Sequence, residues 1–384
     1  MKVLVISHTY ISPINRDKWK FCAHRHPTVD ILVVYPRQWP SSLFLHQASP
    51  GIKQIAPNCS CTALDTLGAG NELLYIYKPH QLRTILKKFR PDIVHVEQGA
   101  GALCYFQVNI FLRILNIKAH SIFFTWINLK PQLSLKNRLY LKFIEKINMH
   151  RADGAITGND DAQTLLRQKG FNKPIIVLPQ LGVSSEIFKP ENQQCFISRP
   201  HKYVGYIGRL TEEKGIFYLA HAFMKIATDF PQWMLTFIGK GPAEYRLHSF
   251  IANKQMLNRI ELCNPVPHET IAQYLRKIDI LVLPSYDTPQ WREQFGHILI
   301  EAMASGVAVI GSDAGHIPHV IKDSGLIFVQ RNEEDLIAKL QTLMQDEELR
   351  KKFAEHGRIR AHAEYSHEVI ADKTYNFWRT ISNA

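Results

Sequence analysis

The sequence lacks an uninterrupted apolar stretch long enough to cross a bilayer. Its most apolar long window, residues 99–117, is interrupted by Gln107, Asn109 and Arg113, whereas a spanning helix needs about 20 mainly apolar residues. At the N-terminus the first apolar run covers only residues 3–6, which is too short for a signal peptide. We therefore expect a cytoplasmic protein without a membrane-spanning segment.

Motifs for metals and redox cofactors are also missing. The chain has six cysteines without C-x-x-C spacing, and the one close pair, Cys59 and Cys61, cannot supply the four ligands of a structural zinc site. No D-x-D motif offers a divalent-cation site, and no G-x-G-x-x-G follows an apolar strand, which argues against a dinucleotide-dependent oxidoreductase. We expect reduced thiols, no metal and no cofactor.

The length and the charge distribution divide the chain into two halves. A chain of 384 residues exceeds a usual single domain. Residues 1–190 hold 24 Lys and Arg against 11 Asp and Glu, while the remainder holds 22 against 23, so the net charge of +12 comes from the first half. A basic half-molecule favours a polyanion or an anionic membrane surface. The alternative is a solvated basic face.

The first half has the pattern of a doubly wound α/β sheet. Apolar runs predict strands at 2–7, 29–35, 92–96, 121–126 and 154–158, alternating with helical segments such as 81–89 and 134–150. Ligands bind such sheets beyond the carboxyl ends of the strands. This rule selects His8, Glu97 and Asn128 as candidates. Each could instead be a structural residue whose hydrogen bonds are satisfied internally.

Residues 130–151 alternate leucine and isoleucine with lysine and arginine, as in a basic amphipathic helix that could contact anionic lipid. The alternative is an ordinary surface helix whose apolar stripe packs on the sheet, with the basic face left available to headgroups.

The second half repeats the strand–loop–helix order, with strands expected at 204–207, 234–238, 260–262, 280–283 and 307–310 and a helix at 266–279. The loop after the first of these strands carries Arg209 and Lys214 before a helix near Gly215. Cations beside a helix N-terminus favour a diphosphate. Taken by itself, this segment could also be a solvated loop whose two positive charges bind no ligand.

Residues 286–321 carry the strongest signal of the chain. Glu293 lies in a loop before an apolar helical run, and Glu301 lies eight positions further on. The free N–H groups of the helix suit a phosphate, and two carboxylates suit vicinal hydroxyls of a sugar and a ribose. Alternatively, Glu293 caps the helix and Glu301 faces solvent.

The pattern Glu293-x-Phe295-Gly296-x-x-x-x-Glu301-Ala302 resembles the E-x7-E signature of retaining GT-B glycosyltransferases of the family 4 type, also described as glycosyl transferases group 1, and GRLTEEKG resembles a further element of that family. The resemblance implies that Glu293 addresses the donor hexose, that Glu301 holds the ribose, and that Arg209 and Lys214 neutralise the leaving diphosphate. It assigns the remaining donor contacts to Gly208, Gly239, Gly241, Phe295, Gly296, His297 and Ile298.

The resemblance implies two Rossmann-like domains facing across a cleft, with an acceptor-side domain at 1–190, a donor domain at 191–365 and a final helix at 366–384 that returns to the first domain. It implies metal-independent transfer from a nucleotide-diphosphate sugar to a glycan or lipid-linked acceptor in cell-surface polysaccharide synthesis, with an anionic membrane surface as a further partner and no nucleic acid. The alternatives are a nucleotide-sugar epimerase and a noncatalytic binding module. The chain departs from the family in its first loop, residues 12–18, which lacks a Gly-Gly pair, and at Asn128, near where many members have a histidine.

Overall fold

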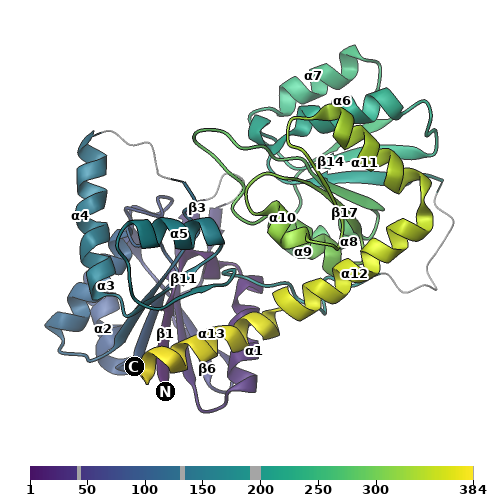
Figure 1. Cartoon of the computed structure of the whole chain (residues 1–384). Coiled ribbons are helices and arrows are strands. Elements are labelled where there is room, and N and C mark those ends of the chain that lie inside the picture. The colour runs from purple at the N-terminus through teal and green to yellow at the C-terminus, as the bar shows by residue number, and fades with distance from the viewer. Residues whose placement is uncertain (41–44, 130–134, 191–199, 384) are drawn as a thin grey trace. The chain divides into compact units, whose positions relative to one another are not determined.

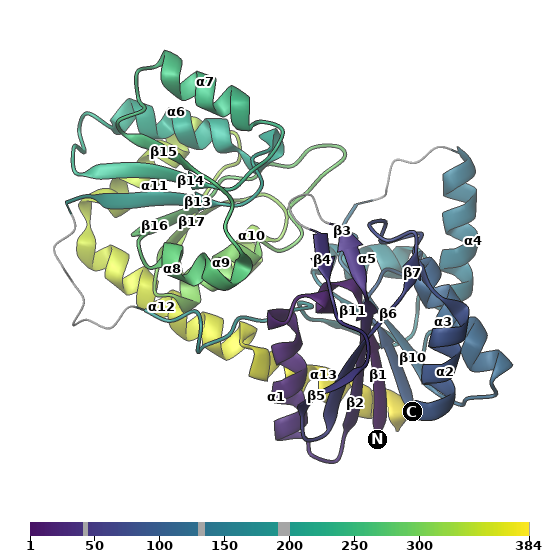
Figure 2. The same ribbon diagram turned by 180° about the vertical axis from the view of Figure 1, so that it is seen from behind.

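The computed structural model describes residues 1–40, 45–129, 135–190 and 200–383. The chain forms two compact units (Figures 1 and 2). One comprises Met1–Gly182 together with His367–Ala384, and the other comprises Val183–Ser366. Among the residues that the structure describes, every helix is too short or too polar to span a bilayer.

In the described part of the first unit, eight strands form one sheet in the order β12-β11-β10-β9-β1-β2-β6-β5. All neighbours pair in parallel except β5 and β6. The apolar run of β1 is buried on both faces, as expected for the centre of a parallel sheet. The strands are β1 (Lys2–Ile6), β2 (Asp30–Pro36), β5 (Ile52–Ala56), β6 (Cys59–Leu64), β9 (Ile93–Val96), β10 (His120–Thr125), β11 (Gly154–Thr157) and β12 (Ile175–Val177).

Helices cover this sheet, and two short hairpins stand beside it. The N-cap Asn159 of α5 accepts a hydrogen bond from the backbone N–H of Ala162 at 2.8 Å, which fixes the start of that helix. The helices are α1 (Asp17–Arg25), α2 (Pro79–Phe89), α3 (Leu103–Ile114), α4 (Leu135–Arg151), α5 (Asp160–Gln168) and α13 (His367–Ser382); the hairpin strands are β3 (Gln38–Pro40), β4 (Leu45–Gln47), β7 (Thr66–Leu67) and β8 (Ile76–Tyr77).

The last helix, α13, is part of the first unit and packs against α1 (Figure 1). The buried indole rings of Trp19 and Trp378 stack with their centroids 5.4 Å apart. At the surface, the Arg25 guanidinium donates to both carboxylate oxygens of Asp372. Because exposed ion pairs contribute little free energy, the buried aromatic contact carries most of this docking.

The second unit has a parallel sheet whose order in the described residues is β15-β14-β13-β16-β17-β18. Its strands are β13 (Lys202–Ile207), β14 (Trp233–Ile238), β15 (Ile260–Cys263), β16 (Ile280–Leu283), β17 (Ala308–Ser312) and β18 (Leu326–Phe328). Its helices are η4 (Glu212–Lys214), α6 (Ile216–Ile226), α7 (Glu244–Asn253), η5 (His268–Thr270), α8 (Ile271–Leu275), α9 (His297–Ala304), α10 (Ile317–Ile321), α11 (Glu333–Gln345) and α12 (Glu347–Tyr365).

Both sheets change strand order at a central strand. In the first sheet β1 lies between β2 and β9, and in the second β13 lies between β14 and β16. Such switch points open a crevice beyond the carboxyl ends of the strands, where α/β proteins bind ligands. The candidates His8 and Glu97 follow β1 and β9, and the candidate Arg209 follows β13.

The structure differs from the sequence-based expectation in some details. The helix expected over 266–279 is reduced to the short η5 and α8. Unit boundaries fall after Gly182 and after Ser366 rather than after positions 190 and 365. The backbone N–H of Val183 donates to the carbonyl of Tyr365 at 2.9 Å, and Val183 also forms a parallel bridge with Ser366, so the segment before 190 already pairs with the second unit. The polar segment 190–202, with Pro190 and Pro200, predicts a linker between the halves; most of it, residues 191–199, lies outside the described residues.

Candidate functional site

Lys214 and Glu293 meet at the switch point of the second sheet. The Lys214 ammonium lies 2.6 Å from Glu293 Oε2, and the hydroxyl of Ser285 donates to the same oxygen at 3.0 Å. Ser285 follows β16 directly, and Lys214 ends the short η4 helix in the loop after β13. The Lys214 ammonium also lies 4.8 Å from the centre of the Trp291 ring. The pair is thus held at the edge where a ligand is expected.

Gly296 begins α9 in a backbone conformation that suits glycine. Its φ is +83°, and a Cβ there would lie 2.8 Å from Leu283 Cδ2. The first turn of α9 therefore starts abruptly, with the N–H groups of Gly296, His297 and Ile298 at a helix N-terminus. This end attracts an anion through its partial positive charge.

Phe295 anchors this turn from inside the unit. Its side chain is buried, with ring centroids 5.6 Å from Tyr365 and 6.1 Å from His316. The expectation from the sequence was a donor contact at this position. The geometry fits a role in holding the Phe295–Gly296 backbone.

Glu301 lies inside α9 and is buried rather than solvent-facing, so the alternative of a solvated Glu301 is wrong. His268 Nε2 lies 2.7 Å from Glu301 Oε1. Burial disfavours the imidazolium, but the hydrogen bond and charge of Glu301 outweigh that effect and raise the pKa of His268. His297 lies beside the same carboxylate, and burial lowers its pKa although Glu301 and Glu293 act in the opposite direction.

The glycines after β13 and β14 bring two loops into close contact. A Cβ on Gly239 would lie 1.9 Å from the carbonyl oxygen of Gly208, and one on Gly241 would lie 2.3 Å from the carbonyl oxygen of Leu210. A larger residue at Gly239 would force the two loops apart. Arg209, within this loop pair, is exposed and makes no ion pair among the described residues, unlike Lys214.

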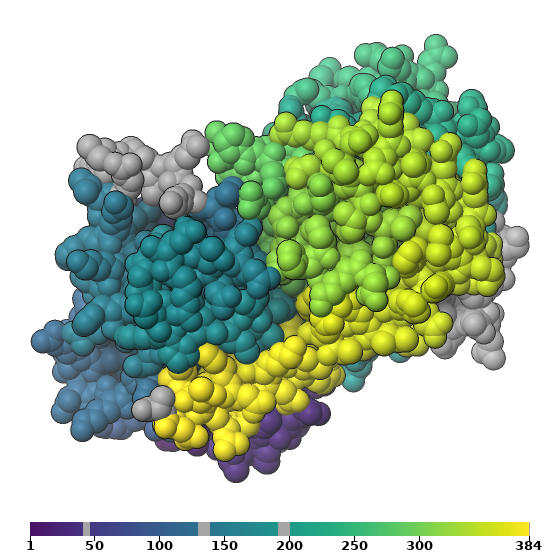
Figure 3. All heavy atoms as spheres, viewed as in Figure 1, coloured from purple at the N-terminus to yellow at the C-terminus, as the bar shows by residue number. Residues whose placement is uncertain are grey.

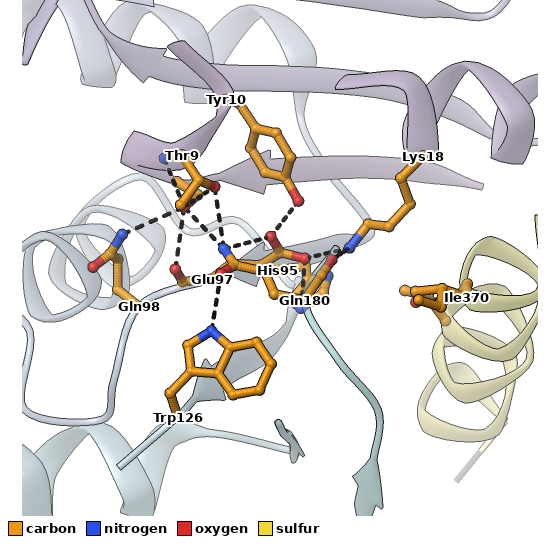
Figure 4. A network of polar contacts seen from close by, with 11 residues as sticks. Thr9, Tyr10, Lys18, His95, Glu97, Gln98, Trp126, Gln180 and Ile370 are labelled. Atoms are coloured by element: carbon orange, nitrogen blue, oxygen red, sulfur yellow. Dashed lines mark hydrogen bonds and ion pairs between the residues drawn. The ribbon is translucent and has the colours of Figure 1, made fainter. Parts of the chain in front are cut away.

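In the first unit, the sequence-selected Glu97 lies in a buried polar network rather than at an open edge (Figure 4). The Lys18 ammonium lies 2.8 Å from Glu97 Oε1, and the Tyr10 hydroxyl donates to Oε2. Both charged side chains are at most 2% exposed. Burial disfavours the charged form of Glu97 and acts to raise its pKa. The charge of Lys18 outweighs this effect, so the pKa of Glu97 is lowered.

Gln180 ties this network to the last residues before the unit boundary. Its side-chain amide nitrogen lies 3.1 Å from Glu97 Oε2 and 3.2 Å from Thr9 Oγ1. Its backbone carbonyl accepts a hydrogen bond from Lys18 Nζ at 2.6 Å. The Trp126 indole donates to its side-chain oxygen at 3.2 Å. Figure 4 shows these groups converging around Glu97. The carboxyl edge of the first sheet is therefore held by residues from several strand ends.

His95 lies below this network, on β9. Its ring is fully buried and packs edge-on against the indoles of Trp19 and Trp378, and neither ring nitrogen has a hydrogen-bond partner among the described residues. Burial lowers the pKa of His95 to about 4. The imidazole is therefore neutral at physiological pH.

The two other first-unit candidates lie apart from the Glu97 carboxylate. The His8 ring stacks on Trp39 with centroids 4.5 Å apart, and its Nδ1 lies 2.6 Å from the amide nitrogen of Gln98. Burial lowers the pKa of His8, although Glu72 opposes this. Asn128 lies in the loop after β10 and is partly buried.

Four residues that position the candidate groups were not selected from the sequence: Ser285, His268, Lys18 and Gln180. Each lies far from its partner in sequence except Ser285, which is eight residues from Glu293. The rule that ligands bind beyond the carboxyl ends of strands could have selected Ser285, because Ser285 follows β16 as Glu97 follows β9. Within the described residues, no cluster of three or more His, Cys, Asp or Glu side chains could hold a metal ion.

Comparisons with known proteins agree with this geometry. Residues 187–360 match the family model described as glycosyl transferases group 1. The chain is 27% identical over 228 residues to an uncharacterized glycosyltransferase of Methanocaldococcus jannaschii, a match that covers 59% of each protein. The matches cover 52% to 64% of four curated relatives, so the chain spans little more than half of their length.

Two solved structures share the fold along the chain. Sucrose-phosphate synthase from Thermosynechococcus elongatus aligns with a TM-score of 0.74 and 20% identity over 99% of both chains. Anabaena HepE, solved with UDP and glucose, aligns with a TM-score of 0.71 and 16% identity over 99% of this chain and 100% of that one. Residues 187–360 are thus similar to the group 1 glycosyltransferases, and the chain has the GT-B fold.

Proposed function

We propose that this chain transfers a hexose-type sugar from a nucleotide-diphosphate sugar to a glycan or lipid-linked acceptor, with retention of configuration. The observation that carries the proposal is the Lys214–Glu293 ion pair at the carboxyl edge of the second sheet, next to the N-terminus of α9. The UDP and glucose in the similar HepE structure support a nucleotide-sugar donor.

The donor lies on the second unit in this proposal. Its diphosphate is bound by Lys214, Arg209 and the N–H groups at the start of α9, because positive groups concentrate there. Glu301 accepts hydrogen bonds from the ribose hydroxyls through the oxygen that His268 does not occupy. Glu293 holds the hexose.

The reaction breaks the bond between the anomeric carbon and the diphosphate oxygen and forms a bond from that carbon to an acceptor hydroxyl oxygen. The electron pair of the broken bond goes to the diphosphate, and an oxygen of the diphosphate takes the acceptor proton. Lys214 and Arg209 stabilise the charge that develops on this leaving group. The sugar acquires positive character near the Glu293 carboxylate, and no metal is required in this scheme.

The acceptor lies on the first unit, where His8 and Asn128 offer polar groups beyond the ends of β1 and β10. Glu97 does not contact the acceptor in this proposal, because its carboxylate is held by Lys18 and Gln180 inside the unit. It supports the acceptor side by holding these neighbouring residues in place. We place the reaction on the cytoplasmic side of a membrane in cell-surface polysaccharide synthesis. The basic first half supports this assignment through its attraction to anionic lipid and glycan.

A thermal-shift panel of nucleotides and nucleotide sugars tests the donor assignment. A cognate donor raises the unfolding temperature by mass action, and at 100 times its Kd it adds about 2.7 kcal/mol of stability. Transfer is then assayed with the stabilising donor in excess chelator. Loss of transfer that magnesium restores would contradict the metal-independent scheme. Conversion of the donor without an acceptor would instead identify an epimerase.

A further inference from the structure

The outward face of α4 exposes apolar and basic side chains together. Leu139 and Phe143 are 61% and 62% exposed, and Tyr140 is 37% exposed. In a helix, residues one turn apart lie on the same side, so Leu139 and Phe143 are neighbours. Isolated exposed apolar residues are ordinary, but three within five positions of one helix form a patch. Lys142 and Lys146 are exposed beside them.

The opposite face of α4 is occupied by its own unit. The buried Asn148 amide donates to the carbonyl of Ala100 at 2.7 Å, and Ile144 is 4% exposed. The helix therefore does not need its Leu139–Phe143 face for packing. The alternative of an apolar stripe that packs inward therefore holds for Ile144 but not for Leu139. The side chains of 135–138 and residues 130–134 lie outside the described part.

The charge of this face is positive. The helix sequence has five Lys and Arg residues and one acidic residue, Glu145. Glu145 pairs with Lys169 at 2.5 Å and its side chain is 20% exposed, so its charge is neutralised away from the patch. Figures 1 and 3 show α4 at the outer margin of its unit. Apolar side chains flanked by lysines match the acyl boundary and the headgroups of an anionic bilayer.

We propose that the face of α4 formed by Leu139, Tyr140, Lys142, Phe143 and Lys146 docks on anionic lipid. Docking through this face would place the first unit at a membrane. The proposal rests on the proposed function in one respect, namely that a lipid-linked acceptor would be reached at that membrane. The apolar side chains enter the headgroup region and the lysines bind phosphate groups.

Vesicle flotation of the full chain tests the proposal. Vesicles of phosphatidylcholine with phosphatidylglycerol are compared with pure phosphatidylcholine at low and high salt. We expect binding to the anionic vesicles at low salt. Leu139→Asp/Phe143→Asp should lower it more than tenfold, and Lys142→Ser/Lys146→Ser about thirtyfold, since each lysine near an anionic surface contributes a factor of about five.

The matched control is Tyr245→Asp/Ile359→Asp, which adds the same charge at residues of the second unit that are 81% and 56% exposed. It should bind vesicles almost as well as the unchanged chain. Equal binding by the α4 variants, or binding that is equal on pure phosphatidylcholine and insensitive to salt, would overturn the proposal. So would a dimer in light scattering that only the α4 variants dissociate, because the occupant would then be a second copy.

The nucleotide thermal shift is measured on the same samples. A retained shift without vesicle binding would refute the membrane face and leave the donor assignment intact. Vesicle binding without any nucleotide shift would refute the donor assignment and leave the membrane face intact.

Discussion

Replacing Lys214 by methionine should destabilise the second unit as well as stop transfer. Methionine keeps most of the apolar stem and removes the ammonium that lies 2.6 Å from Glu293. The two side chains are 15% and 9% exposed, so the carboxylate loses its counter-ion in a mostly dry site. Breaking a buried pair costs about 3–5 kcal/mol, and the residual exposure of this pair brings our expectation to about 2–3 kcal/mol.

Urea unfolding followed by tryptophan fluorescence measures this loss, which corresponds to a fall of about 1 M in the midpoint. Lys214→Met/Glu293→Gln removes both charges and should recover most of the stability, giving a coupling free energy of about 2 kcal/mol in the double-mutant cycle. Arg209→Met is the matched control. It removes an exposed charge and should change stability by less than about 0.5 kcal/mol.

Transfer should fall in all three variants, because each lacks a cation proposed to stabilise the diphosphate. Of the two cations, only Arg209 is expected to be removable with little effect on stability, because it is exposed whereas Lys214 is paired with Glu293. Equal stability of Lys214→Met and Arg209→Met would refute the reasoning, since a pair formed in a dry site cannot be broken at no cost.

Three further outcomes follow from the site and its support. His95 has a pKa of about 4 in the fold, against an ordinary value of 6.5. Its contribution to stability is therefore complete above pH 6.5 and falls by about 3 kcal/mol as the pH approaches 4. His95→Phe should lose this part of the acid sensitivity in urea titrations, and parallel pH profiles of the variant and the unchanged chain would count against it. Gly239→Ala should lower the unfolding temperature and abolish the nucleotide shift, because its Cβ would meet the Gly208 carbonyl; an unchanged shift would show that the loops tolerate separation. Glu301→Gln should weaken binding of a nucleoside diphosphate about tenfold and leave binding of pyrophosphate unchanged in calorimetry, whereas equal weakening of both would exclude a ribose contact.

The sequence predicted the groups that belong to short motifs. Glu293, Gly296 and Glu301 lie within nine consecutive residues, so their spacing alone placed them at one helix start. The central strands were equally readable, because buried parallel strands are continuous apolar runs. The edge strands β5, β12 and β18 were not predicted, since they are short and their residues are largely exposed or half-buried. The buried strand β6 was also not predicted.

Contacts between side chains that lie far apart in the sequence were not predicted. Lys18 lies in the segment DKWKFCAHR, where a lysine normally faces solvent, and its burial depends on Glu97, 79 residues later. His268 likewise depends on Glu301, 33 residues away. No local pattern distinguishes such residues from surface charges. Glu97 was selected because it follows β9 at the switch point, but Lys18 and Gln180 hold its side chain inside the unit.

The chain passes between its two units twice, once after Gly182 and once after Ser366, and these passages are neighbours because Val183 bridges to Ser366. Gln180 lies just ahead of the first passage and is held by Lys18 and Glu97, so the chain leaves the first unit from a residue that is anchored in its buried polar network.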